Sequence, residues 1–427
     1  MDLRFGRRDF LKAIGAGAGA AALSSCATIG SGSAGKVVVV GAGYGGATAA
    51  KYIRMWSAGA IDVTLVEAGA EFISCPMSNL VLGGSKTLAD LTVGYDNLSR
   101  RHGIKLARDT ATAVDTEKRS VKLAGGTELA YDRLVLSPGV DFMWDRVPGL
   151  NNASAQAAIL HAWKAGPQTL ALRRQLQDMP DGGVFALTIP PMPYRCPPGP
   201  YERACLVAGY FKQSKPKSKV LLLDANPEIQ SKKVLFERAF AEHYQGLIEY
   251  RPNNELKQVD AATRTAKFDF DDVKADVLNV VPPQRAAELV RSAGLVNINN
   301  RWVGVHWLTM ESTAAPGIHV IGDAVFGAPL MPKSGHLANQ HAKVAAAAII
   351  QLLKGEPINP TPVMANTCYS FVTVSEAIHV CSVHQYDVAE KTFKVMPGGG
   401  LSSAANALEG RYAFSWAQNM WADMRLA

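Results

Sequence analysis

Cysteine is the residue type in this chain with the clearest potential for chemistry, and the spacing of its six copies limits what they can do. No cysteine opens the C-x-x-C-H pattern of covalent haem, and no group of cysteine, histidine and carboxylate residues has the spacing of a metal site. We therefore expect no bound metal. Such cysteines can pair as disulfides, which thiolate-like nucleophiles attack. The six are Cys26, Cys75, Cys196, Cys205, Cys368 and Cys381.

Cys196 stands in an unusual segment, IPPMPYRCPPGPYERA at residues 189–204. The preceding run VFALTI predicts a buried strand, and nucleotide-binding folds place a glycine-rich, phosphate-binding loop directly after such a strand. Proline has no backbone N–H for a phosphate. The next predicted strand ends in Asp224, where the acid that binds a ribose would stand. We therefore predict a nucleotide-binding fold that has lost its nicotinamide cofactor, so that electrons come from a source other than NADH.

A second nucleotide-binding pattern, near the N-terminus, is complete. Residues 35–55 read as a β-branched strand, the spacing Gly41-x-Gly43-x-x-Gly46 and an Ala-rich helix, and Glu67 ends the next strand. The glycines permit a tight turn and close approach of a pyrophosphate, the helix N-terminus faces the phosphates, and the acid binds ribose hydroxyls. Strand, helix and acid together predict a dinucleotide site.

Two further strands end in glycine-containing turns, YDRLVLSPG at 131–139 and PGIHVIGDA at 316–324. These resemble motifs of the FAD-containing pyridine nucleotide-disulfide oxidoreductase superfamily, in which an aspartate at the position of Asp323 binds the ribityl-phosphate region of FAD. The resemblance favours FAD over NAD at the first site. It implies an α/β fold with two Rossmann-like domains of the disulfide-oxidoreductase type, the FAD domain being discontinuous, plus a smaller C-terminal α+β region.

The expected domain boundaries follow from these motifs. We expect an FAD-binding domain at 35–150 and 300–360, a degenerate nucleotide-binding-like domain carrying Cys196 at 151–299, and a C-terminal domain carrying Cys368 at 361–427. Residues 161–179 have an amphipathic, helix-like pattern that opens the inserted domain.

The first 34 residues are typical of a twin-arginine export signal, with Arg7 and Arg8 before a short apolar run that ends in small residues. The alternative is a surface helix with two arginines. Export by this route predicts a periplasmic protein loaded with a redox group. Cleavage after Ala27 would release the chain, whereas a lipoprotein box would leave lipid on Cys26. The net charge of +7 is a mild excess that does not imply nucleic acid, and we expect no transmembrane segment after the signal.

Several segments together resemble the flavoprotein subunit of flavocytochrome c sulfide dehydrogenase. The resemblance covers nearly the whole chain from Lys36. It includes ISCPMSN, HAWKAG, RCPPGPYERA, PPQRA, GDAVFGAPLMPKSG, NTCYSF and YAFSWAQNMWADM. The resemblance implies that Cys75 holds FAD through a thioether at the 8α-methyl group, although Pro76 departs from the family's pattern. It also implies that Cys196 and Cys368 form a redox-active disulfide beside the flavin, which accounts for the odd number of cysteines after the signal.

Each cysteine also has a structural interpretation. Cys75 could be a small buried apolar residue, and Cys196 with Cys368 could be an inert bridge. We interpret Cys205 and Cys381 as buried thiols or a second structural bridge.

Sulfide is the substrate that the resemblance implies. Hydrosulfide would open the disulfide and leave a persulfide and a thiolate. Glu202 is a candidate proton acceptor or, alternatively, a helix N-terminal acid favoured by the macrodipole. Lys333 could offset charge on reduced flavin or could be a surface lysine. His336 and His341 are interpreted as packing or hydrogen-bonding residues.

The chain has no haem motif, so we expect a c-type cytochrome subunit or a soluble cytochrome c as electron acceptor. One alternative is a sulfide:quinone oxidoreductase, which would need a membrane-contacting segment. Another is a flavoprotein accessory factor of sulfur oxidation with little turnover of its own.

Overall fold

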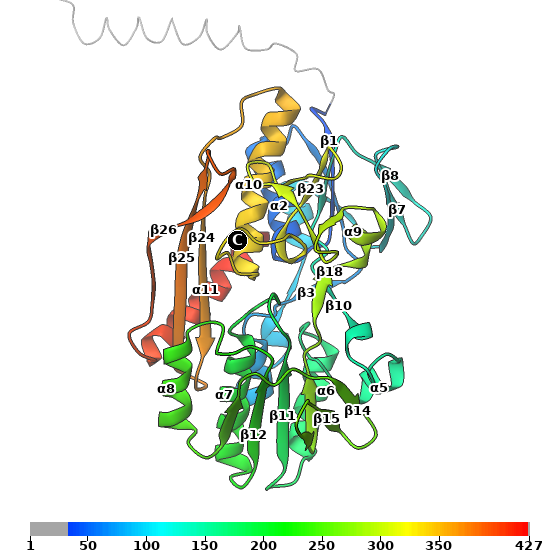
Figure 1. Cartoon of the computed structure of the whole chain (residues 1–427). Coiled ribbons are helices and arrows are strands. Elements are labelled where there is room, and N and C mark those ends of the chain that lie inside the picture. Colours follow the sequence, from blue (N-terminus) through cyan, green and yellow to red (C-terminus); the bar gives the residue numbers. More distant parts are fainter. Residues whose placement is uncertain (1–32, 426–427) are drawn as a thin grey trace, which may run out of the picture. The chain divides into compact units, whose positions relative to one another are not determined.

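The main sheet has seven strands in the order β21-β22-β23-β9-β1-β2-β5 (Figure 1). The pairs from β23 to β5 are parallel, and β1 lies centrally between β9 and β2. Its run of valines is buried, as expected for a strand covered on both faces. The strands are β1 (Lys36–Val40), β2 (Asp62–Val66), β5 (Lys105–Ala107), β9 (Arg133–Leu136), β21 (Val305–His306), β22 (Glu311–Ser312) and β23 (Ile318–Val320).

Helices α2 (Tyr44–Trp56) and α10 (Gly335–Lys354) pack against each other beside this sheet (Figure 1). Both are rich in alanine, which lets their backbones approach closely. The Ser334 side chain accepts a hydrogen bond from the Leu337 N–H and so caps the start of α10. Smaller elements of this region are β3 (Glu71–Ile73), α3 (Ser78–Gly83), η1 (Ala89–Leu91), β4 (Thr92–Gly94), α4 (Asp96–His102), β6 (Ala111–Asp115), β7 (Ser120–Leu123), β8 (Glu128–Ala130), α9 (Glu288–Ser292), β19 (Val296–Ile298), β20 (Trp302–Val303) and η3 (Gly322–Ala324).

A second, smaller parallel sheet has the order β13-β12-β11-β17. The antiparallel pair of β10 (Val140–Phe142) and β18 (Gln284–Ala286) stands at its junction with the rest of the chain. The elements of this inserted region are η2 (Trp144–Arg146), α5 (Ala153–Ala158), α6 (Pro167–Asp178), β11 (Val184–Ile189), α7 (Gly199–Ser214), β12 (Lys219–Asp224), α8 (Lys233–His243), β13 (Ile248–Arg251), β14 (Gln258–Asp260), β15 (Thr265–Lys267), β16 (Asp272–Lys274) and β17 (Val277–Val280).

The helix expected over residues 161–179 begins only at Pro167. Gly166 has a φ of 150°, which a side chain rarely adopts, and Pro167 suits the first helical position. Residues 161–166 are therefore a loop, and this loop enters the candidate site described below.

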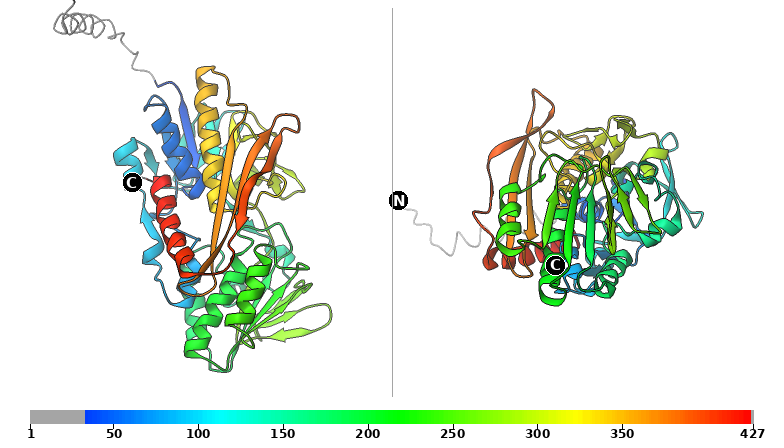
Figure 2. Two further views of the ribbon diagram at one scale, coloured as in Figure 1. Left: turned by 90° about the vertical axis from the view of Figure 1, so that its left-hand side faces the viewer. Right: turned by 60° about the horizontal axis from the view of Figure 1, so that its bottom comes forward.

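The C-terminal region contains an antiparallel sheet of β24 (Val363–Phe371), β25 (Ala377–Asp387) and β26 (Thr392–Leu401), followed by α11 (Ala407–Arg425). Figure 2 shows this sheet and α11 beside α10 and α2. The predicted fold class is confirmed: two α/β sheets, the larger one parallel from β23 to β5 and the smaller one parallel throughout, and a C-terminal α+β region. Gly35–Ala427 form one unit, so the domain boundaries expected at 150, 300 and 360 stay predictions.

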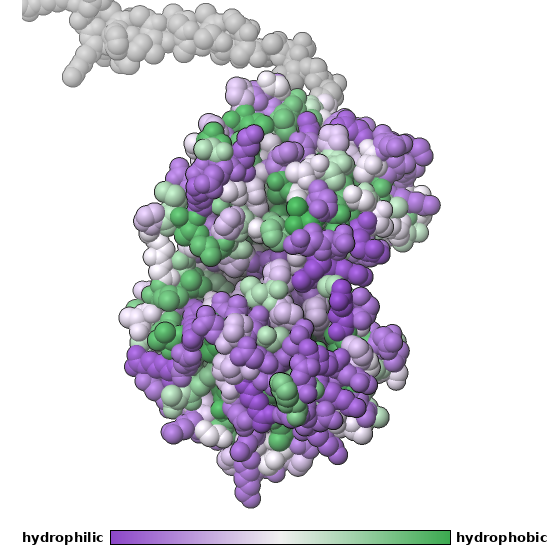
Figure 3. All heavy atoms as spheres, viewed as in Figure 1, coloured by the Kyte–Doolittle hydropathy of each residue, from purple (hydrophilic) through white to green (hydrophobic). Residues whose placement is uncertain are grey.

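The computed structural model describes residues 33–425. The expected export signal, with Arg7, Arg8 and Cys26, lies outside the described residues. Within 33–425, no helix combines the length and the apolar character that a membrane crossing requires. Figure 3 shows hydrophilic residues over much of one face, above all in its lower half, where Figure 1 places β11 and β12.

Candidate active site

The three glycines of the first turn have different surroundings. A Cβ on Gly41, whose φ is +88°, would lie 2.5 Å from the Ser137 carbonyl oxygen, and one on Gly46 would lie 1.7 Å from the Gly41 oxygen. These two positions therefore require glycine for backbone packing. A Cβ on Gly43 would meet nothing within 4 Å. This open position at the start of α2 leaves room for the phosphates of a dinucleotide.

Glu67 lies at the same turn. Its Oε2 accepts a hydrogen bond from the Ala42 N–H at 2.8 Å, and its Oε1 accepts one from the Gly69 N–H at 2.8 Å. The carboxylate is thus held at the carboxyl end of β2 beside the glycine loop, which is where a ribose-binding acid stands in this kind of fold.

Asp323, in η3, has an incomplete set of partners. Its Oδ1 is buried without a hydrogen-bond partner, and its Oδ2 lies 3.9 Å from Nη1 of Arg195. A buried carboxylate oxygen without a donor is costly. The orphan oxygen suits a ligand hydroxyl, so the residues present fit FAD, with Gly43 and Glu67 toward the phosphates and ribose and Asp323 toward the ribityl chain.

Lys333 is buried, so its interpretation as a surface lysine is wrong. Its Nζ donates to the Asp323 carbonyl oxygen at 2.9 Å and to the Val325 carbonyl oxygen, and it lies 3.7 Å from the centre of the Trp302 ring. Burial lowers the pKa of Lys333 to about 7, while the nearby Asp323 charge opposes this shift. Lys333 thus holds the turn that presents Asp323, and its effect on a flavin stays a prediction.

The structure places Cys196 and Cys368 on segments that contact each other, the start of α7 and β24. Cys196 lies just before α7 with a φ of 56°, and its N–H donates to the Lys333 carbonyl oxygen at 2.9 Å. Cys368 comes from β24, in the C-terminal sheet. Burial raises the pKa of both thiols, and a charge on Cys368 raises that of Cys196 further. Cys196 is nevertheless accessible to solvent. Both residues are thiols in this structure, and their disulfide stays a prediction.

Glu202, on α7, links the two cysteine-bearing elements. Its Oε1 accepts the Phe371 N–H of β24 at 2.8 Å, and its Oε2 accepts from Nδ2 of Asn79 at 2.8 Å. Burial raises its pKa, and these hydrogen bonds partly oppose the shift. The carboxylate therefore fastens β24 to α7, and its partners lie outside its own helix.

Lys232 was not found by sequence analysis. It is only 5% exposed, and its Nζ donates to the Cys368 carbonyl oxygen and to Oγ of Ser370, each at 2.9 Å. Its positive charge opposes the effect of burial on the pKa of Cys368. The sequence around it reads as an ordinary basic loop before a helix, so no local signal could have identified it.

Arg195 joins Cys75 to the same site. One guanidinium nitrogen, Nη2, donates to Sγ of Cys75 at 2.8 Å and to the Trp163 carbonyl oxygen at 2.6 Å. The Ala165 N–H also donates to Sγ of Cys75, at 3.4 Å. The half-buried Cys75 therefore has polar partners from the loop before α6, unlike a cysteine in an apolar core.

The other expected residues have structural surroundings. Cys205 is buried within α7 and Cys381 lies on β25, and both are thiols. Cys381 pairs across the strands with Thr367, the neighbour of Cys368, so Cys381 and Cys368 point to opposite faces of the sheet.

The two histidines of α10 act as hydrogen-bond acceptors. Nδ1 of His336 accepts the Thr367 N–H at 2.9 Å, and Nδ1 of His341 accepts the Gly322 N–H at 3.2 Å. Burial lowers the pKa of both rings. They are hydrogen-bonding residues, as the sequence analysis interpreted them.

In the inserted region, Asp224 stands where a ribose-binding acid would, and protein groups bond to both of its carboxylate oxygens. Oδ2 of the buried Asp224 accepts from the hydroxyls of Tyr201 at 2.6 Å and Tyr250 at 3.1 Å. Its Oδ1 accepts from the backbone and side-chain nitrogens of Asn226 at 2.9 and 2.7 Å. With both oxygens engaged, Asp224 has no free acceptor for a ribose.

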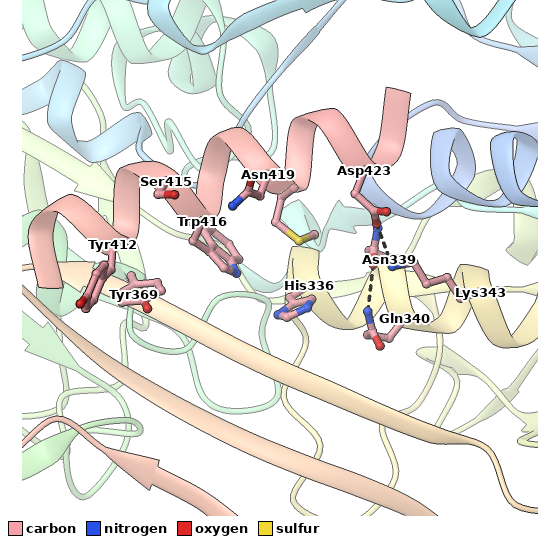
Figure 4. A pocket seen from close by; sticks show the side chains of 11 residues that line it. His336, Asn339, Gln340, Lys343, Tyr369, Tyr412, Ser415, Trp416, Asn419 and Asp423 are labelled. Atoms are coloured by element: carbon pink, nitrogen blue, oxygen red, sulfur yellow. Dashed lines mark hydrogen bonds and ion pairs between the residues drawn. The ribbon is translucent and has the colours of Figure 1, made fainter. Parts of the chain in front are cut away.

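Helix α11 borders a hollow of about 420 Å³ with α10 and β24, shown in Figure 4. Asp423 pairs there with Lys343 at 2.8 Å and accepts from Nδ2 of Asn339 at 2.7 Å. Nε1 of Trp421 donates to the Tyr44 hydroxyl at 3.1 Å, so α11 is fastened to the helix that starts at the glycine loop.

Among residues 33–425, no group of three or more His, Cys, Asp or Glu residues could hold a metal ion.

Three family models match the chain. One described as the pyridine nucleotide-disulphide oxidoreductase matches residues 35–176. One for the central part of the sulfide dehydrogenase [flavocytochrome c] flavoprotein chain matches residues 169–282, and one for the flavin-binding part of flavocytochrome c sulphide dehydrogenase matches residues 360–424. The flavin-binding matches support FAD as the ligand.

The chain is also similar in sequence to individual sulfide-oxidising flavoproteins. The sulfide dehydrogenase [flavocytochrome c] flavoprotein chain of Chlorobaculum thiosulfatiphilum is 54% identical over 46 residues, which are 11% of this chain and 94% of that sequence. The mitochondrial sulfide:quinone oxidoreductase of Dictyostelium discoideum is 23% identical over 357 residues, 80% of this chain and 77% of its own.

Among solved structures, the sulfide:quinone oxidoreductase of Aquifex aeolicus superposes with a TM-score of 0.74 at 19% identity, covering 91% of each chain, and so shares the fold. These matches show that the chain belongs to the family of flavocytochrome c sulfide dehydrogenase flavoprotein chains.

Proposed function

We propose that this chain is an FAD-dependent sulfide dehydrogenase that oxidises sulfide through a Cys196–Cys368 disulfide and passes the electrons to a c-type cytochrome. The observation that carries this proposal is the contact between the two segments that hold the cysteines. Cys196, in the loop after β11, donates its N–H to the carbonyl oxygen of Lys333 beside the turn of Asp323, and β24, which holds Cys368, is hydrogen-bonded to α7 through Glu202. Cys196 is accessible to solvent, so a disulfide formed there would be open to hydrosulfide.

The charges around the two cysteines favour an anionic substrate. Basic side chains outnumber carboxylates at the site, and a local positive potential raises the concentration of a small anion such as hydrosulfide. The basic side chains are Arg195, Arg203 and Lys232, and the carboxylates are Glu202 and Asp323. Lys333, whose pKa burial lowers to about 7, adds a positive charge below that pH.

In the proposed reaction, hydrosulfide attacks one sulfur of the disulfide. The S–S bond breaks, so that one cysteine carries a persulfide and the other becomes a thiolate. FAD, when bound, supplies a two-electron acceptor beside the pair. Lys232 stabilises negative charge at Cys368, and Glu202 keeps β24 and α7 in register. Glu202 is also the proposed acceptor of the hydrosulfide proton, because its charge acts on both cysteines.

We further propose that Cys75 holds FAD through a thioether. Its sulfur lies in polar contact with Arg195, which also approaches Asp323, so one side chain connects the two residues expected to contact the flavin. The proposed location is the periplasm, after export by the twin-arginine route.

Support for a cytochrome acceptor is the match of two family models described as flavocytochrome c. The second candidate acceptor is a quinone, because the Dictyostelium and mouse relatives are named sulfide:quinone oxidoreductases.

The decisive experiment is a visible spectrum of the purified protein. We expect sulfide alone to bleach the flavin at once, and oxidised cytochrome c, but not decylubiquinone, to restore the oxidised spectrum. A flavin that sulfide does not bleach would contradict sulfide oxidation and favour an accessory factor. Restoration by the quinone alone would leave sulfide oxidation intact and contradict the cytochrome as acceptor.

A further inference from the structure

Arg195 immediately precedes Cys196, yet its side chain reaches Cys75. Its Nη2 lies 2.8 Å from Sγ of Cys75, and its Nη1 lies 3.9 Å from Oδ2 of Asp323. Its Nε is buried and has no hydrogen-bond partner. The guanidinium thus spans the space between the cysteine and the acid, and one of its donors is unused.

The backbone around Arg195 is held on both sides. The Arg195 N–H donates to Oε1 of Gln284 at 3.0 Å, and the Cys196 N–H donates to the Lys333 carbonyl oxygen at 2.9 Å. Nη2 is also held by the Trp163 carbonyl oxygen at 2.6 Å. These contacts give the guanidinium a defined position, so its contact with Cys75 is a directed one.

A guanidinium has donors and no acceptor, so the sulfur of Cys75 must accept this hydrogen bond through a lone pair. Nη2 is fixed by the Trp163 carbonyl oxygen, so its hydrogen bond restricts where Sγ of Cys75 can lie. The arginine is therefore placed to orient the sulfur.

We propose that Arg195 is the positioning residue for covalent attachment of FAD to Cys75. This inference rests on the proposed thioether. In that step a bond forms between Sγ of Cys75 and the 8α carbon, and the thiol proton and one methyl proton are released. Two electrons pass to the flavin ring and then to an acceptor such as dioxygen. Arg195 touches the sulfur and forms no bond with carbon, so its role is to orient Cys75 before the bond forms.

The test compares Arg195→Met and Arg195→Lys with the wild type and with Arg301→Met. Arg301 is a matched control, because its hydrogen bonds go to the Pro193 and Gln284 carbonyl oxygens around the same segment and not to Cys75. Each protein is incubated with FAD in air. Total flavin is read from the visible spectrum, and covalent flavin from the mass of the chain after acid denaturation.

We expect wild type and Arg301→Met to acquire covalent flavin fully. Attachment to Arg195→Met should be at least about tenfold slower at pH 7, with Arg195→Lys between the two. Arg195→Met should still bind FAD without a covalent bond to the wild-type level. A purely structural role for Arg195 would lower the total bound flavin as well.

Attachment to Arg195→Met at the wild-type rate at pH 7 would overturn the inference, and so would a loss of total bound flavin equal to the loss of covalent flavin. If Arg195→Met does not fold, Arg195→Leu, which also lacks the donor to Cys75, decides by the same two criteria. A wild type without covalent flavin would instead refute the thioether at Cys75, and with it the role of Arg195, while sulfide oxidation by bound FAD could still stand.

Discussion

Replacing Glu202 with Gln should lower stability because the buried network offers no arrangement that satisfies an amide. One Glu202 oxygen accepts from the Phe371 N–H and the other from Nδ2 of Asn79. An amide has one acceptor and one donor, so its NH₂ must face one of these donors. Asn79 cannot compensate by flipping, because its Oδ1 already accepts from Nε of Arg203 at 3.0 Å.

The expected cost follows from these contacts. A buried donor left without a partner costs about 1–3 kcal/mol, and removing one charge from a buried ionic network costs about 3–5 kcal/mol when its partner stays charged. Arg203 is buried, is joined to Glu202 through Asn79, and acts on Glu202 through its charge. Burial also destabilises the charged carboxylate, as its raised pKa indicates, and removing the charge recovers part of this free energy. We therefore expect a net loss of about 3 kcal/mol.

The matching change in melting temperature can be worked out. Unfolding entropy is about 2.1 cal/mol/K per residue, or about 0.8 kcal/mol/K for the roughly 390 residues of the Gly35–Ala427 unit. A loss of about 3 kcal/mol then lowers Tm by about 4 °C. Glu242→Gln is the matched control, because Glu242 is exposed and pairs with Arg238 on the same helix face at 2.7 Å, an interaction worth at most about 1 kcal/mol.

The assay is thermal unfolding followed by circular dichroism, combined with the rate of flavin reduction by sulfide between pH 6 and 9. If Glu202 acts by holding β24 against α7, the rate should fall by a similar factor at every pH. A change in the shape of the pH profile would instead indicate that Glu202 accepts a proton. A Tm of Glu202→Gln equal to that of Glu242→Gln would refute the reasoning about the network.

Four further outcomes are expected. Sulfide-driven flavin bleaching should fall to the same residual level, at least roughly 100-fold below wild type, in Cys196→Ser, in Cys368→Ser and in the double variant. Dithionite should still bleach the flavin in all three. Near-normal turnover of Cys368→Ser would show that the bridge is structural. NADH should not bleach the flavin in a stopped-flow assay, because both oxygens of Asp224 are engaged by protein groups, and rapid bleaching at micromolar NADH would contradict this account of the inserted region. Cys75→Ser should bind FAD but release all of it on acid denaturation, and a chain mass that still includes flavin would exclude Cys75 as the link. Comparing Lys333→Met with wild type by chemical denaturation should show the pH effect of burying this lysine. Its pKa of about 7 in the folded state lies below the unfolded value, so the unfolded wild type binds more protons between pH 7 and 10. The unfolding free energy of wild type should therefore rise by up to about 1.4 kcal/mol per pH unit relative to the variant, and a constant difference would contradict the lowered pKa.

Much of the dinucleotide site could be read from the sequence, because its features are local. Gly41 and Gly46 are required by a turn within a few residues of chain, and Glu67 and Asp323 end strands whose hydrophobic patterns are plain. The loss of a phosphate loop near Cys196 could also be predicted, since proline lacks the N–H that a phosphate needs.

The tertiary structure alone decided how the distant residues meet. Glu202 was read as a helix N-terminal acid or a base, and only the packing of β24 against α7 makes it an acceptor for Phe371. Lys232 and Arg195 look like ordinary basic residues in the sequence, and their importance arises from burial against Cys368 and Cys75. Hydrogen bonds and charges act through a few ångströms of space, so partners far apart in the chain leave no local pattern, whereas a glycine turn or a strand-ending acid does.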